Sequence, residues 1–198
     1  MSASNNESLV PPNIPKGMMV LDVGCGTGQL LIDRYGNQRS IGIDVDFRVL
    51  SVAKPLTDKA DFVCCKAEAL PFQDGSFEFV IARLSLPYTN IAKSLKEIGR
   101  VIKTGGQFWG LLERLSLPFR IGLYKKPRFY VFLPYLLLNT LLFRVFARSI
   151  PFIDGKYRGY QTVIGLKRAL RRAGFESIIV TKKLHLVTTA RRSRTVLL

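Results

Sequence analysis

Cysteine and histidine are scarce in this chain. The three cysteines, Cys25, Cys64 and Cys65, have none of the spacings that bind metals, and the single histidine, His185, has no partner in the sequence. We therefore predict no metal site, interpret the cysteines as reduced thiols, and give His185 a structural or surface role.

Leader and membrane-spanning patterns are also missing. The first seven residues lack the basic region and apolar core of a secretory signal, so we expect a cytoplasmic protein. The uncharged apolar run 129–143 has 15 residues and contains Pro134, whereas a spanning helix needs about 20 residues. Three interpretations stay open for this run: a lid over the substrate, an interfacial segment with its arginines at lipid headgroups, or a true span.

Acidic residues are nearly absent from the last third of the chain. Residues 1–113 contain 12 basic and 12 acidic side chains, whereas residues 114–198 contain 18 basic side chains against Asp154 and Glu176. This asymmetry indicates an anionic partner, either a nucleic acid or a phospholipid surface.

A glycine-rich loop near the N-terminus follows a short apolar run. Residues 18–23 form a nearly continuous apolar segment that contains one acid, Asp22, as is typical of a strand buried on both faces. Gly24, Gly26 and Gly28 come next. Glycines at alternate positions allow a sharp turn and the close approach of a ligand to the backbone.

A second strand with an acid near its end follows in residues 39–46. Asp44 lies 22 residues after Asp22, near the spacing at which a carboxylate on the second strand reaches a ribose diol. A carboxylate can accept hydrogen bonds from both hydroxyls.

Strands and helices alternate along the rest of the chain. We predict helices at 29–35, 47–56, 91–103 and 162–172, and further strands at 61–65, 76–82, 107–112, 176–182 and 184–190. This order predicts an α/β fold with a seven-stranded, mostly parallel, Rossmann-like sheet, helices on both faces and a C-terminal antiparallel hairpin. Residues 1–16 are expected to be a flexible tail, and residues 17–198 a single domain with a basic, apolar insert at about 115–160.

Four ordered blocks resemble the class I S-adenosylmethionine-dependent methyltransferases. Residues 20–28 resemble the first motif of that family, and residues 42–45 the second. Residues 67–78 are similar to the loop and fourth strand that follow, and residues 97–106 to the helix and turn before strand five. The resemblance covers residues 17–112 closely and residues 162–192 more loosely.

The resemblance implies S-adenosylmethionine as cofactor. It implies that Asp22 and the glycine loop hold the methionyl end, that Asp44 binds the ribose, and that Val45 lies against the adenine. Ala67 and Glu68 match the loop at the adenine edge, although Lys66 stands where many members have an acid. The expected cofactor-binding residues are Asp22, Gly24, Cys25, Gly26, Gly28, Asp44, Val45, Ala67, Glu68 and Arg83.

Methyl transfer from a sulfonium needs in-line alignment and an apolar pocket more than a particular side chain, so no catalytic residue is predicted. The substrate-facing candidates are Ser85, Tyr88, Tyr157 and Tyr160. Arg83 either binds an anionic substrate group or forms a surface ion pair.

We expect the acceptor to be a small or lipid-like molecule. The Leu70-Pro71-Phe72 loop is seen mostly in the family branch that acts on small molecules, quinones and lipids. The alternatives are an RNA or DNA methyltransferase that uses the basic C-terminal third, and a non-catalytic cofactor-binding protein. Strand four is not followed by the Asn/Asp-Pro-Pro-aromatic motif of exocyclic-amine methyltransferases, which makes nucleic acid the weaker choice. Peripheral membrane association is expected as an additional property, and the oligomeric state stays open.

Overall fold

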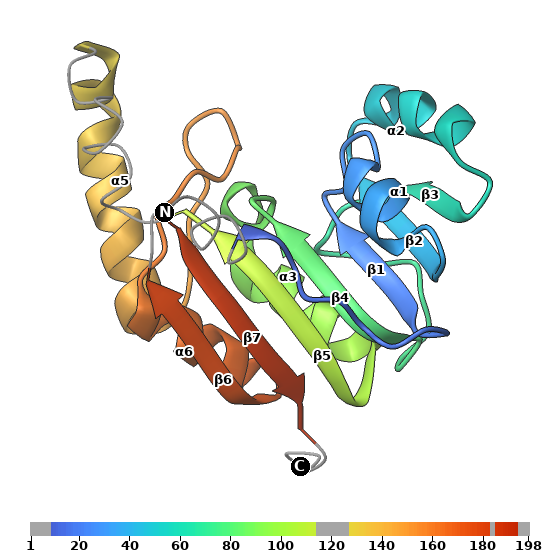
Figure 1. Ribbon diagram of the computed structural model, residues 1–198. Helices are drawn as coiled ribbons and strands as arrows, with labels where there is room; N and C mark the ends of the chain where they lie inside the picture. Colours follow the sequence, from blue (N-terminus) through green and yellow to red (C-terminus); the bar gives the residue numbers. More distant parts are fainter. Residues whose placement is uncertain (1–8, 114–126, 183–184, 194–198) are drawn as a thin grey trace, which may run out of the picture.

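The computed structural model describes residues 9–113, 127–182 and 185–193, and within these it shows a seven-stranded sheet with helices on both faces (Figure 1). The strands are β1 Met19–Val23, β2 Arg39–Asp44, β3 Ala60–Cys64, β4 Phe77–Arg83, β5 Ile102–Leu112, β6 Phe175–Lys182 and β7 Leu186–Arg192. The α-helices are α1 Gln29–Tyr35, α2 Phe47–Ala53, α3 Ile91–Val101, α5 Pro127–Phe146 and α6 Val163–Arg172.

The strand order is β3-β2-β1-β4-β5-β7-β6. Strands β1 to β5 are parallel, whereas β7 lies antiparallel between β5 and β6. The predicted fold class is therefore confirmed. The order reverses at β1, where the chain crosses from one half of the sheet to the other, and ligands bind at such a switch point.

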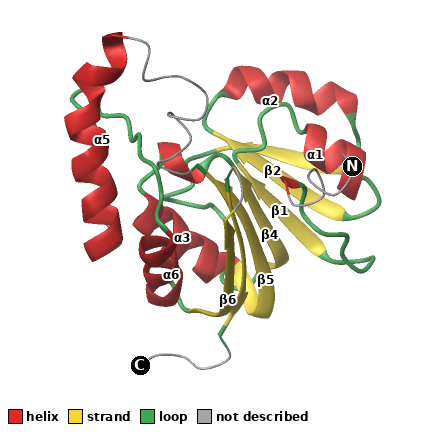
Figure 2. Ribbon diagram, turned by 60° about the vertical axis from the view of Figure 1, so that its left-hand side comes forward, coloured by secondary structure: helices red, strands yellow, loops and turns green. Residues whose placement is uncertain are grey.

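Different helices cover the two faces of the sheet. Helices α3 and α6 lie on one face, and α1 lies on the other (Figure 2). The larger core includes Leu21, Val80 and Leu95, and the smaller one includes Val20, Phe79 and Trp109. Successive residues of β1 and β4 thus enter opposite cores, as the two-residue repeat of a strand requires.

Residues 9–15 lie against the face that α1 covers. Leu9 and Ile14 pack on the smaller core, and the hydroxyl of Tyr35 donates a 2.8 Å hydrogen bond to the carbonyl of Pro12. This part of the segment expected as a loose tail is thus held on the sheet. Residues 1–8 of that segment lie outside the described residues.

The predicted ends of α2 and α3 and the predicted start of β5 are wrong. Helix α2 ends at Ala53, because Pro55 has no N–H to continue it, and residues 54–56 form a 3₁₀ turn. Helix α3 ends at Val101, and β5 begins at Ile102 rather than at Gln107. Ile102 already pairs with Phe77 of β4, and the register shift before the next pair absorbs the two glycines that had been expected to follow the helix.

Helix α5 extends the predicted apolar run at both ends and contains Pro134. Its inner side, which includes Leu136, Asn139 and Phe143, is buried against the rest of the domain. No helix in the described part of the chain has the combination of length and apolarity that crossing a membrane requires.

Candidate functional site

A pocket of about 730 Å³ opens at the carboxyl ends of β1, β2 and β4. Its lining consists of Val23, Gly24, Ile43, Asp44, Val45, Cys65, Lys66, Ala67, Glu68, Arg83, Leu84, Ser85, Tyr88, Thr89, Gly155, Lys156, Tyr157 and Arg158. The structure therefore brings nine of the predicted site residues to one cavity. Asp22, Cys25, Gly26, Gly28 and Tyr160 are the predicted residues that do not line it.

The glycine loop is folded tightly against the neighbouring strands. The N–H groups of Gly24 and Cys25 donate to the carbonyl of Ile43 at 2.8 and 2.9 Å. A Cβ added to Gly24 would lie 2.3 Å from the Cβ of Ser85, whereas a Cβ added to Gly26 would meet nothing within 4 Å. Gly24 is thus required by packing, and Gly26 leaves an open surface against which a ligand can lie.

The carboxylate of Asp44 joins β2 to the glycine loop. Its Oδ2 accepts from the N–H of Gly26 at 3.0 Å, and its Oδ1 accepts from the N–H of Asp46 at 3.0 Å. An ionised carboxylate has about four acceptor positions, so two stay available for a ligand's hydroxyl groups.

Asp22 is buried beneath the loop, with 2% of its surface exposed. Its Oδ1 has no hydrogen-bond partner among the described residues. Burial raises the pKa of Asp22 to about 7, and the nearby positive charge of Arg83 opposes part of that rise. Burying a carboxylate oxygen that has no hydrogen-bond partner costs free energy, and a cation placed beside it would offset that cost.

The side of the pocket expected to hold adenine combines apolar and polar groups. Val45 is 65% exposed, and the buried Ala67 also lines the cavity. The Glu68 carboxylate accepts from the N–H of Asn90 at 2.7 Å, which fixes it at the start of α3. Lys66, in the position where an acid was expected, also lines the cavity.

Cys25 and Gly28 support the loop from behind. The Cys25 thiol lies over Gly42, where an added Cβ would be 2.6 Å from the sulfur, and burial raises the pKa of the thiol. A Cβ at Gly28 would lie 2.7 Å from the ring of Phe62. Both residues therefore hold the shape of the loop rather than the surface of the cavity.

Ser85, Tyr88 and Tyr157, the predicted substrate-facing residues that line the cavity, are here called the acceptor wall. The Ser85 hydroxyl donates to the carbonyl of Val23 at 2.5 Å, and the Tyr157 hydroxyl accepts from Nδ2 of Asn90 at 3.1 Å. Tyr88 is 59% exposed and is the wall's accessible phenol.

Glu113, directly after β5, was missed by the sequence reasoning. Tyr88 donates a 3.3 Å hydrogen bond to its Oε1. Burial and the Glu113 charge raise the pKa of Tyr88, and burial, Glu113 and Tyr88 together raise that of Tyr160 to about 12. An acid at the end of a strand was the signal that identified Asp44, and it applies to Glu113 as well.

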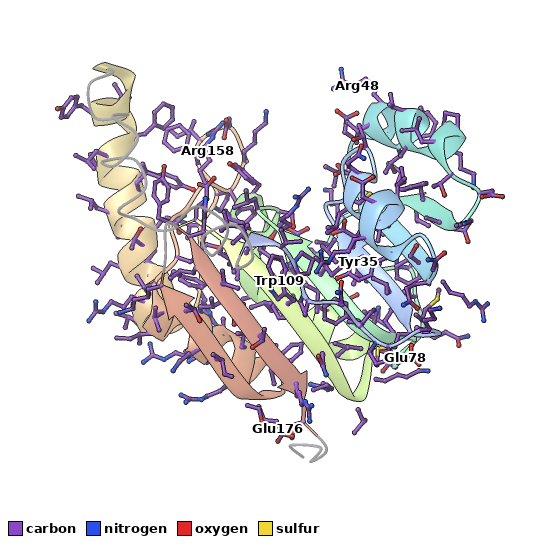
Figure 3. All side chains as sticks on the ribbon, viewed as in Figure 1. Tyr35, Arg48, Glu78, Trp109, Arg158 and Glu176 are labelled. Carbon is purple, nitrogen blue, oxygen red and sulfur yellow. The ribbon has the colours of Figure 1, made fainter. Side chains whose placement is uncertain are left out.

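The loop that follows α5 supplies Lys156, Tyr157 and Arg158 to the pocket. Arg158 pairs with Asp154 at 2.7 Å, and its guanidinium lies 5.8 Å from the ring centre of Phe132 on α5. Figure 3 shows Arg158 on this loop beside α5. The position of this part of the pocket lining therefore depends on α5.

The part of the chain that forms most of the pocket matches a known protein family model. Residues 21–110 match the family model described as "Methyltransferase domain". The matched stretch runs from the first strand to the fifth and contains the loop, Asp44 and Arg83.

Two curated relatives match about half of the chain. The ubiquinone/menaquinone biosynthesis C-methyltransferase UbiE of Xanthomonas oryzae pv. oryzae is 39% identical over 105 residues, which are 48% of this chain and 42% of the relative. The demethylmenaquinone methyltransferase of Bacillus licheniformis is 37% identical over 103 residues, 48% of this chain and 44% of the relative. The matched part thus spans less than half the length of either relative.

A solved structure matches the fold over nearly the whole chain. An S-adenosylmethionine-dependent methyltransferase from Methanosarcina mazei superposes with a TM-score of 0.66 at 18% identity, covering 98% of each chain. At this identity the likeness establishes the fold.

Proposed function

We propose that this protein is a class I S-adenosylmethionine-dependent methyltransferase that methylates a small or lipid-like acceptor. The match of residues 21–110 to the methyltransferase-domain model supports this proposal. The observation that carries the proposal is the hydrogen bond from the N–H of Gly26 to the Asp44 carboxylate at the switch point of the sheet. It places the acid beside the open surface at Gly26.

The residues present fit the cofactor. The partnerless Oδ1 of Asp22 suits the methionyl ammonium, which would also relieve the cost of burying that carboxylate. Asp44 has acceptor positions left for the ribose hydroxyls, and Val45 and Ala67 offer apolar surface to the adenine. The backbone N–H of Gly26 is already bonded to Asp44, so this loop contributes shape rather than free donors.

When bound, S-adenosylmethionine supplies an electrophilic methyl group. The chain's own task is to hold the acceptor in line with that methyl and to exclude water. Ser85 and Tyr157 shape the acceptor side while their hydroxyls are engaged by neighbours. Tyr88 and Glu113 can remove the acceptor's proton: the proton passes to the Tyr88 oxygen as the Tyr88 proton passes to Glu113.

Aromatic and apolar groups on the acceptor side support a small or lipid-like substrate. Tyr88, Tyr157 and Leu84 line this side of the pocket. One curated relative is named for ubiquinone/menaquinone biosynthesis and the other is named as a demethylmenaquinone methyltransferase, and both names support the same substrate class.

Calorimetric titration with S-adenosylmethionine tests the first half of the proposal. Incubation with methyl-labelled cofactor and an extract separated into organic, protein and nucleic-acid fractions tests the second half. We expect saturable binding and label in the organic fraction. Label confined to RNA or DNA would show that the acceptor is a nucleic acid and not a small or lipid-like molecule. Binding without transfer to any fraction would indicate a non-catalytic cofactor-binding protein.

A further inference from the structure

Helix α5 presents an apolar surface to solvent. We define its outer face as Val131, Leu137, Leu138, Leu141 and Val145; Val131 is 72% exposed and Leu141 is 56% exposed. Val131 and Leu138 are seven residues apart, and Leu137, Leu141 and Val145 follow one another at intervals of four, so the five side chains lie on one side of the helix. Figures 1 and 2 both show α5 at the margin of the molecule, with no described helix or strand beyond it.

This helix is apolar on its inner side as well. Leu136 and Phe143 face inward and are buried, together with the polar pair Asn139 and Thr140. A helix with large apolar side chains on both its inner and its outer side is normally covered on both sides. A contiguous exposed apolar surface marks a place where something else binds.

Positive charge gathers at the C-terminal end of the outer face. Residues 130–173 contain eight Lys and Arg residues and one acid, Asp154. Arg144 and Arg148 are exposed beside the face. The Arg168 guanidinium of α6 donates to the carbonyl of Arg144 at 2.6 Å, and that of Arg172 donates to the carbonyl of Phe146, so the basic end of α6 is fixed next to α5.

We propose that the outer face of α5 docks on an anionic lipid bilayer, with its leucines and valines among the acyl chains and its arginines at the headgroups. Charge complementarity favours this occupant, because an apolar helix with a basic flank gains from both insertion and the negative surface potential. A second copy of this chain would bring the same positive charge to the contact and would be repelled.

The docked helix would hold the loop that follows it, which lines the pocket, close to the membrane. Asn139 on the inner side of α5 donates to the carbonyls of Ile150 and Arg158 and accepts from the N–H of Ile150 at 2.9 Å. The loop fixed in this way supplies Lys156, Tyr157 and Arg158 to the cavity. This step rests on the proposed function: a lipid-like acceptor would reach the pocket from the bilayer past this loop.

Vesicle co-sedimentation tests the docking without any methyl transfer. The full chain is mixed with vesicles of phosphatidylcholine alone or of phosphatidylcholine with phosphatidylglycerol. We expect binding to the anionic vesicles that falls as salt is raised, and at least about tenfold weaker partitioning into the neutral ones.

Paired variants separate the face from general surface effects. Leu137→Glu with Leu141→Glu places two acids one turn apart on the outer face and should weaken partitioning at least about tenfold. The matched control, Val52→Glu with Leu56→Glu, makes the same change at exposed apolar positions near α2 and should leave partitioning unchanged.

A second pair tests the charge. Arg144→Gln with Arg148→Gln should weaken binding to anionic vesicles. The control, Arg39→Gln with Lys59→Gln, removes equal charge from exposed positions at the starts of β2 and β3 and should have less effect.

Three results would overturn the docking proposal. They are a wild-type chain that stays in the supernatant with both vesicle types, equal losses in the α5 variants and their controls, and a dimer in solution that Leu137→Glu with Leu141→Glu converts to a monomer without any vesicle binding. Calorimetric binding of S-adenosylmethionine by the same variants reports separately on the proposed function.

Discussion

The Oδ2 atom of Asp44 accepts the backbone N–H of Gly26 at 3.0 Å, so the acid of the second strand and the loop after the first strand are one bonded unit. The second oxygen of the same carboxylate accepts the N–H of Asp46, the N-cap of α2. One side chain thus fixes two turns that border the pocket, and a ligand that binds Asp44 meets a preformed loop.

Asp44→Ala should remove both the ribose acceptor and the support of the loop. We expect the affinity for S-adenosylmethionine to fall at least about 100-fold, since charge-assisted hydrogen bonds contribute about 1.5 to 3 kcal/mol each. Asp44→Asn, which keeps one acceptor oxygen, should lose less. Asp61→Ala, at an exposed acid on β3, is the control, and equal affinities in all variants would contradict the role of Asp44.

Alanine at two glycines of the loop should give opposite phenotypes. Gly24→Ala forces a Cβ to within 2.3 Å of Ser85 and should lower the melting temperature by several degrees. Gly26→Ala meets no neighbour, so apart from a cost of about 1 kcal/mol for its positive φ it should fold normally and lose cofactor affinity. Melting curves and calorimetry separate the two effects. A Gly26→Ala protein with normal affinity would show that the ligand lies elsewhere.

The contribution of Asp22 to the free energy of unfolding should fall as the pH rises from about 4 to 7. Its pKa is about 7 in the folded protein and about 4 in the unfolded chain, so the folded state holds the extra proton between these values. Asp22→Asn removes this titration. Across this range, the free energy of unfolding of wild type should drop by about 3 kcal/mol more than that of the variant.

Denaturant unfolding at several pH values measures this difference. Because Glu78 and Glu97 titrate in both proteins, their contributions cancel in the comparison. Parallel curves for the two proteins would contradict the burial cost assigned to Asp22.

Glu113→Gln should lower the pKa of Tyr88 and of Tyr160, because the negative charge of Glu113 helps to raise both. Ultraviolet titration of tyrosinate measures the change, and Tyr88→Phe in the same background identifies the Tyr88 contribution. Unchanged titration curves would separate Glu113 from the two phenols and remove it as their proton acceptor.

Asn139→Ala should free the pocket loop from α5. The variant loses hydrogen bonds to Ile150 and Arg158, each contributing about 1 kcal/mol. Amide hydrogen exchange in residues 150–160 should accelerate while exchange in the sheet is unchanged. Leu138→Ala, at the neighbouring exposed position, should leave the loop protected.

The sheet could be predicted because buried parallel strands leave a clear pattern. The apolar runs around Val20 and Ile41 have no competing helical period, and each is followed by a turn. Gly105 and Gly106 were misleading, because a strand with a register shift uses glycine as readily as a helix end does.

The acceptor wall depends on contacts between distant parts of the chain. Tyr157 meets Asn90 across 67 residues, and Gln161 bonds the carbonyl of Glu113, so no local pattern marks these partners. Position in the sequence also misled the prediction for Tyr160. It lies three residues after Tyr157 and was expected in the pocket, but its side chain does not line the cavity.

The place of β7 in the sheet has a consequence for biosynthesis. It is the last of the seven strands to leave the ribosome, yet it lies between β5 and β6. Until it emerges, β6 has no neighbour to pair with, and β5 keeps one edge open to any other extended chain. During synthesis, strands β1 to β5 can therefore pair first. The free edge of β5 and the unpaired β6 stay vulnerable to aggregation until residues 186–192 arrive.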